Sequence, residues 1–136
     1  MKRKISLVLS LVIIVMAICQ ASILASDISL LNNNTSSTST GFSISSTGKA
    51  TIVIDYMGYP EVTTGATINI TIEKRNLLFF WNDVITDTIT VQGYRYDDEL
   101  YYQLEDSGTY RCTVEYVISG TGGADDVITF EDTASY

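Results

Sequence analysis

Apolar and polar residues that alternate with a period of two are the feature that most constrains the fold of this chain. The alternation is clearest in residues 49–57, 66–74 and 109–118. From Ala66 to Ile72, every second residue is apolar and the residues between them are Thr or Asn. Because successive side chains of a β-strand point to opposite faces, each segment would have one buried face and one face in water. The pattern therefore predicts antiparallel strands that cover a core on one side.

Weaker strand candidates fill the rest of residues 41–136. They lie at residues 42–46, 78–81, 84–92, 99–104 and 127–136. Turn-forming residues separate them, namely residues 58–60, 64–65, 93, 107–108 and the SGTGG run at 119–123. Seven or eight short strands with turns at this spacing predict an all-β, antiparallel β-sandwich over residues 41–136.

The N-terminal segment has the layout of a secretory signal peptide. Three basic residues precede an apolar run from Ile5 to Ile18, and small residues follow at the places that a signal peptidase requires. We expect a signal peptide over residues 1–21, with cleavage after Ala21 and with Ala25 as a second site. The mature protein would then be secreted and extracellular. Two alternatives are an uncleaved membrane anchor over residues 5–25 and a lipoprotein acylated at Cys19.

Residues 22–40 contain an unbroken run of Asn, Ser and Thr, and are predicted to be a flexible leader because they have little apolar surface to bury. Removing residues 1–21 takes away three of the eight basic residues and none of the sixteen acidic ones, which leaves a formal charge of −11. Such a charge repels phosphate backbones and anionic lipid. We therefore expect no nucleic-acid partner and no membrane partner for the mature form. An extracellular protein or polysaccharide is the expected partner.

The segment QLEDSGTYRCTV resembles the corner between strands E and F of an immunoglobulin variable-type domain. The family pattern, an apolar residue and then D-x-G-x-Y-x-C, is matched by Leu104, Asp106, Gly108, Tyr110 and Cys112. The resemblance implies an immunoglobulin-like sandwich in which the Tyr110 hydroxyl bonds to backbone a few residues upstream. The chain as a whole is also similar to small secreted proteins of Gram-positive bacteria that have no assigned activity.

The same resemblance bears on the cysteine. Such domains usually carry a partner cysteine on strand B, and here Ile54 occupies the equivalent position. The resemblance thus implies that Cys112 packs against Ile54 as a buried free thiol, since Cys19 would leave with the signal peptide.

Residues that commonly carry catalysis are scarce. The chain has no histidine, and neither a nucleophile elbow nor a phosphate-binding glycine loop is present. We expect a protein that is not an enzyme and needs no cofactor. Two acidic clusters leave weaker alternatives open, a carboxylate-based hydrolase or a calcium site formed by Asp97, Asp98, Asp125 and Asp126.

Aromatic residues give the strongest indication of binding. LLFFW, residues 77–81, has more large apolar side chains than one strand face can bury, and YRYDDELYY places tyrosines beside carboxylates. The candidate ligand contacts are Trp81, Tyr94, Tyr96, Tyr101 and Tyr102. The alternative is structural: Phe79, Trp81, Tyr96 and Tyr102 would fill the core, and the others would shield an edge.

These observations favour a secreted, non-enzymatic, extracellular binding or adhesion module. The alternative is a secreted effector or bacteriocin-like polypeptide, in which LLFFW acts on a target cell.

Overall fold

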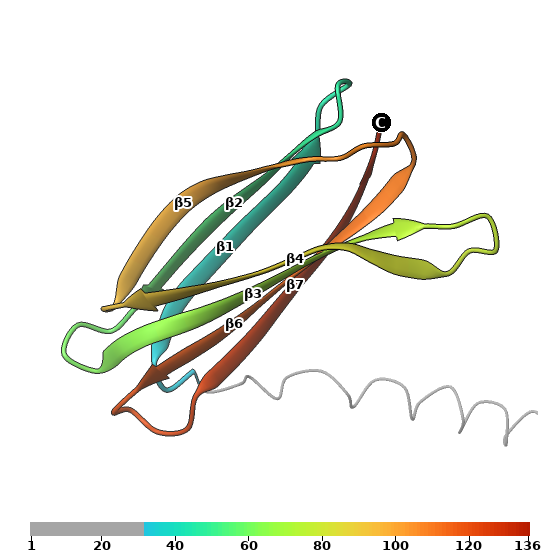
Figure 1. Ribbon diagram of the computed structural model, residues 1–136. Coiled ribbons are helices and arrows are strands. Elements are labelled where there is room, and N and C mark those ends of the chain that lie inside the picture. The colour runs from blue at the N-terminus through green and yellow to red at the C-terminus, as the bar shows by residue number, and fades with distance from the viewer. Residues whose placement is uncertain (1–31) are drawn as a thin grey trace, which may run out of the picture. The chain divides into compact units, whose positions relative to one another are not determined.

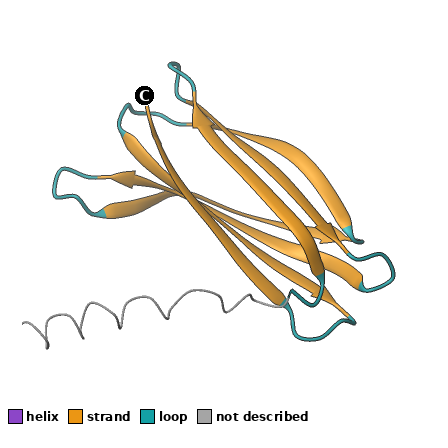
Figure 2. Ribbon diagram, turned by 180° about the vertical axis from the view of Figure 1, so that it is seen from behind, coloured by secondary structure: helices purple, strands orange, loops and turns teal. Residues whose placement is uncertain are grey.

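The computed structural model describes residues 32–136, and this part of the chain is all β-structure. Its seven strands are β1 (Thr35–Ile44), β2 (Lys49–Gly58), β3 (Thr63–Arg75), β4 (Trp81–Gln92), β5 (Arg95–Gln103), β6 (Thr109–Gly120) and β7 (Asp126–Ser135). They form two antiparallel sheets, with the orders β1-β2-β5 and β4-β3-β6-β7, whose faces lie opposite each other (Figures 1 and 2). The predicted antiparallel β-sandwich is confirmed. Within residues 32–136 there is no helix of the length and apolarity needed to cross a membrane.

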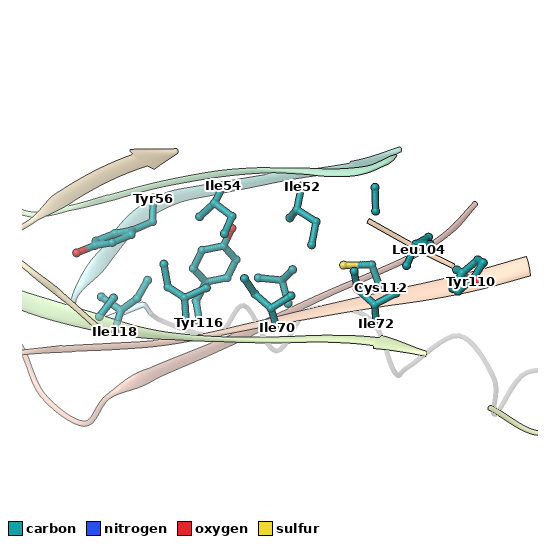
Figure 3. Close-up of a cluster of buried hydrophobic side chains, with 14 residues drawn as sticks. Ile52, Ile54, Tyr56, Ile70, Ile72, Leu104, Tyr110, Cys112, Tyr116 and Ile118 are labelled. Carbon is teal, nitrogen blue, oxygen red and sulfur yellow. The ribbon is translucent and has the colours of Figure 1, made fainter. Parts of the chain in front are cut away.

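The core lies between the two sheets and is built from the three segments that alternate most strictly. Its buried residues are Ala50, Ile52, Ile54 and Tyr56 of β2, Ala66, Ile68, Ile70 and Ile72 of β3, Tyr110, Cys112, Val114, Tyr116 and Ile118 of β6, and Leu104. Figure 3 shows these side chains reaching toward one another from both sheets. Burying each large apolar side chain contributes roughly 1.5–3 kcal/mol. These core residues and the strand pairings of the described part of the chain all lie within one compact unit, Asn32–Tyr136.

The first strand begins inside the predicted flexible leader, so that prediction is wrong from Thr35 to Thr40. The preceding backbone N–H groups of Asn33 and Asn34 each donate to the Asp126 carboxylate at 2.8 Å, and the buried Asn34 side chain donates to the Ala124 carbonyl. The polar run is ordered because hydrogen bonds, rather than apolar burial, satisfy it. The rest of the predicted leader, 22–31, and the predicted signal peptide lie outside the described residues.

The strand predicted at residues 78–81 is also wrong. Residues 76–80 form the turn that joins β3 to β4, and only Trp81 belongs to a strand. The β3–β4 hairpin extends past its neighbours in the sheet and projects away from them (Figures 1 and 2). Four large apolar side chains therefore stand on a turn, where no second sheet covers them.

The corner before β6 is closed by Tyr110, whose hydroxyl donates to the Asp106 carbonyl oxygen. Gly108 has a φ of 152°, a conformation that favours glycine, and its backbone pairs with that of Tyr136. Cys112 is a buried free thiol. Ile54 is equally buried, but Figure 3 shows it at the level of Tyr116, with Ile52 between it and Cys112 along the core. Ile54 and Cys112 therefore belong to the same core, and the direct packing of one on the other that the resemblance implies stays a prediction.

Candidate functional site

The end of the β3–β4 hairpin carries the most exposed large apolar side chains of the described domain. The exposed fractions are 98% for Leu77, 74% for Leu78, 71% for Phe79 and 65% for Phe80. We call these four residues the apolar tip. Single exposed apolar residues are ordinary, but consecutive ones that form a contiguous patch indicate a contact surface.

Asn76 holds the backbone of the apolar tip in one conformation. Its side-chain oxygen accepts the N–H groups of Leu78 and Phe80, at 2.9 and 3.0 Å. Its own backbone N–H donates to the Phe80 carbonyl, and its carbonyl accepts the Phe79 N–H. An Asn side chain that bonds to backbone N–H groups two and four residues ahead stabilises a tight turn. The tip is therefore a loop whose backbone is held by hydrogen bonds.

Phe79 occupies the left-handed region of backbone conformation, with a φ of 67°. This region is unfavourable for a bulky L-residue and costs of the order of 1–3 kcal/mol. The Arg75 guanidinium lies over the Phe79 ring, 4.6 Å from its centroid. The hydrogen bonds of Asn76 and this cation–π contact help to hold the aromatic ring at a position where glycine would fit without strain.

Basic side chains surround the base of the apolar tip. Lys74, Arg75 and Arg111 are three of the five Lys and Arg residues in residues 32–136, and we call them the basic collar. Arg111 lies 4.7 Å above the centroid of the Trp81 ring and bonds to Glu73 at 2.6 Å, and this bond raises the pKa of its guanidinium. Lys74 pairs with Asp106 at 3.1 Å, which likewise raises the pKa of its ammonium group. Two of the three collar residues are thus paired with acidic side chains, Asp106 and Glu73.

A groove of about 800 Å³ runs beside the tip, between the hairpin and the corner that precedes β6. It is lined by Lys74, Leu77, Phe79, Val84, Gly108 and Thr109, among others. One wall of the groove is therefore continuous with the apolar tip.

The structure distributes the five predicted ligand contacts over different surfaces. Trp81 is half-buried at the start of β4, whereas Tyr94 is exposed in the turn that follows the end of the same strand. Tyr96 and Tyr102 lie on the inner side of β5, half-buried against the core. Tyr101 is exposed, with the Lys49 ammonium 3.6 Å from its ring centroid. The five side chains therefore do not form one binding platform.

The two inner tyrosines of β5 match the structural alternative. The Tyr102 hydroxyl donates to Asp87 at 2.7 Å, and the Tyr96 hydroxyl donates to Asp98 at 2.8 Å. Burial, together with Asp98, raises the pKa of Tyr96 to about 12, and burial and Asp87 raise that of Tyr102. The same alternative places Phe79 in the core. Phe79 is instead exposed, because it lies on the turn.

The predicted carboxylate clusters lie in different sheets. Asp97 and Asp98 belong to β5, whereas Asp125 and Asp126 stand at the start of β7. Both carboxylate oxygens of Asp126 already accept backbone N–H groups. In the described domain, no three acidic, Cys or His side chains are grouped as metal ligands would be. The four calcium candidates therefore do not form a common site.

Cys112 has the properties of a core residue. Burial, with a smaller contribution from Asp132, raises the pKa of its thiol to about 12. A thiol in this environment is protonated near neutral pH and shielded from reagents.

The sequence contained signals for the residues that were not singled out. Asn76 ends the alternation of β3 and precedes four apolar residues, which is typical of a turn, and Lys74 and Arg75 come directly before it. Arg111 reaches the site only through the pairing of β3 with β6, which places it opposite Glu73. Protein-family models and curated protein sequences show no match to this chain.

Proposed function

We propose that this protein is a non-enzymatic binding or adhesion module that contacts its target through the apolar tip. The observation that carries the proposal is the exposure of four consecutive large apolar side chains on a hydrogen-bonded turn. Complete removal of these side chains from water would contribute roughly 5–9 kcal/mol before the costs of association. That gain is of the same order as the cost of association, roughly 4–15 kcal/mol, and a hydrogen-bonded loop loses less conformational entropy on binding.

Secretion and an immunoglobulin-like fold belong to the same proposal. The N-terminal residues 1–21 support an extracellular location. Two features of the domain support the fold assignment: β2 pairs with β5 while β3, β6 and β7 are neighbours, and Tyr110 closes the corner. In such sandwiches, turns at the ends of the strands commonly carry the binding surface while the core supplies rigidity.

The proposal is tested by depletion of the protein from solution. The domain of residues 32–136 is incubated with intact bacterial and animal cells and with insoluble cell-wall polysaccharides, and the supernatant is assayed. The tip variant is Leu77→Ser/Leu78→Ser, and the matched control is Val53→Ser/Val127→Ser, which changes two exposed apolar residues elsewhere.

We expect at least one solid phase to retain the wild-type domain and the control variant, but to release the tip variant. All three proteins should unfold at the same denaturant concentration, because the altered side chains lie outside the core. Equal retention of the tip and control variants would contradict the proposed contact surface. Retention of no protein by any phase would contradict the adhesion function.

A further inference from the structure

We infer that the apolar tip docks on a lipid bilayer, with Leu77–Phe80 below the headgroups and with Trp81 and the basic collar at headgroup level. This inference rests on the proposed function and names the partner of the same surface. It is carried by the shape of the tip, by the order of residue types along the hairpin and by the hydrogen bonds of the loop.

The apolar residues stand on a projecting hairpin, and of the four only Leu77 and Phe79 also line the groove beside it. Leu77 is 98% exposed at the end of a hairpin that stands away from its neighbouring strands (Figure 1). A protein partner would need a pocket of matching shape, whereas lipid chains adapt to any apolar projection. A convex, contiguous apolar surface of this kind therefore suits a deformable partner.

The residue types along the hairpin follow the depth profile of a membrane interface. No charged residue lies between Asn76 and Asn82. Trp81 and Arg75 pair at the base of the tip, and Arg111 stacks on Trp81. Tryptophan and basic side chains favour the headgroup region, while Leu and Phe favour the hydrocarbon below it.

The loop satisfies much of its own backbone hydrogen bonding. The N–H groups of Asn76, Leu78, Phe79 and Phe80 all donate within residues 76–80. Unpaired backbone groups are costly in lipid because no water is present to bond with them. The four internal bonds lower the cost of taking this turn out of water.

The charge distribution changes the sequence-based expectation that the mature form has no membrane partner. That expectation treated the negative charge as spread evenly over the protein. The structure instead groups three basic residues around the tip and pairs Lys74 with Asp106 and Arg111 with Glu73. At physiological ionic strength, charges farther than roughly 8 Å from the lipid are largely screened. Within the described domain, Arg75 is the collar residue that forms no salt bridge, so it supplies most of the collar's attraction for the headgroups.

The test uses Trp81, the only tryptophan of the chain, as the reporter. The domain of residues 32–136 lacks the apolar run of residues 5–18, so that run cannot contribute to vesicle binding. We expect phosphatidylcholine vesicles to shift the Trp81 emission to the blue and to carry the domain upward in flotation. Brominated lipid should quench this emission. Leu77→Ser/Leu78→Ser should bind at least about 30-fold more weakly, and Val53→Ser/Val127→Ser within twofold of wild type.

Vesicles with added phosphatidylglycerol test the collar. We expect Arg75→Gln to weaken binding to these vesicles about fivefold at 150 mM salt, and Arg95→Gln, on β5, to leave it unchanged. Binding to the anionic vesicles should be weaker at 10 mM salt, where repulsion by the distant acidic residues is no longer screened. Equal effects of both arginine variants would overturn the assigned role of the collar.

The remaining outcomes separate this inference from the proposed function. Tip-dependent retention on cells without any vesicle binding would overturn the lipid assignment and leave a protein as the partner. If the tip variant binds vesicles as tightly as wild type, the lipid assignment is also overturned. A dimer that the tip variant abolishes, without vesicle binding, would identify a second copy as the partner and overturn the lipid assignment. Release of an encapsulated dye would contradict superficial docking and favour the effector alternative.

Discussion

Phe79 links the backbone conformation of the turn to the binding role that we propose for it. Its ring is exposed, and its backbone adopts a φ of 67°, which glycine would adopt at no cost. An aromatic residue at this position lowers stability and adds apolar surface at the tip. A residue that lowers stability but adds exposed apolar surface is expected where that surface is used for binding.

The first prediction concerns this strain. Phe79→Gly should leave the free energy of unfolding unchanged or raise it by up to about 1 kcal/mol, because relief of the unfavourable φ offsets the loss of the contact with Arg75. Phe80→Gly, at a similarly exposed position without positive φ, should lower it by about 0.5–1 kcal/mol. Urea denaturation measures both variants. Equal losses of stability would show that Phe79 is not strained.

The second prediction concerns the corner hydroxyl. Tyr110→Phe should lower the free energy of unfolding by about 0.5–1.5 kcal/mol, because the Asp106 carbonyl loses its donor in a partly buried setting. Tyr59→Phe, which alters an exposed tyrosine, should change it by less than about 0.5 kcal/mol. Thermal and urea unfolding would reveal the difference, and a neutral Tyr110→Phe variant would contradict a stabilising role of the bond.

Among elements, the start of β1 depends on the loop between β6 and β7. Asn33 and Asn34 bond to Asp126, and a Cβ atom at Gly122 would clash with the Asn33 carbonyl oxygen. Only a glycine allows this approach. Burial alone would raise the pKa of Asp126, but the N–H groups of Asn34 and Asn33 outweigh it and hold that pKa below the ordinary value.

The third prediction follows from this lowered pKa. A carboxyl group whose pKa is lower in the folded state stabilises the protein above its unfolded-state pKa, and that contribution is lost as the pH falls through the folded-state value. Asp126→Asn should therefore cost about 1–3 kcal/mol at pH 7, and its difference from wild type should shrink below about pH 4. Urea unfolding at several pH values measures this. Asp125→Asn, at the exposed neighbour, should show no such difference, and an equal effect of the two variants would contradict the assignment.

The sequence predicted the strands that bury apolar side chains. It did not predict the start of β1 or the turn at residues 76–80, where hydrogen bonds rather than apolar burial determine the structure. The buried faces of β2, β3 and β6 follow directly from alternation, because apolar burial determines which side of a strand faces inward. The first part of β1 could not be recognised in this way, since its Ser and Thr residues are ordered by backbone pairing with β2, and Asn34 just before it is held by Asp126 and Ile118, more than 80 residues away. The tip residues were singled out by composition. Their exposure became evident only when residues 76–80 proved to be a turn.

At the scale of the whole domain, charge and apolar surface are separated. The apolar tip stands at one projecting end with three basic residues behind it, two of which pair with Glu73 and Asp106, whereas the other acidic residues are spread over both sheets. A uniform acidic surface would only keep the protein apart from other anions. The apolar tip is therefore the end of the domain suited to contact, and the acidic surface of the rest of the domain disfavours non-specific association.

Paired depletion measures directly whether the apolar tip is the contact surface. Retention of wild type, Leu77→Ser/Leu78→Ser and Val53→Ser/Val127→Ser on the same cells and vesicles would be measured side by side. We expect only Leu77→Ser/Leu78→Ser to stay in the supernatant. If that variant is retained as fully as Val53→Ser/Val127→Ser, the contact surface lies elsewhere on the domain.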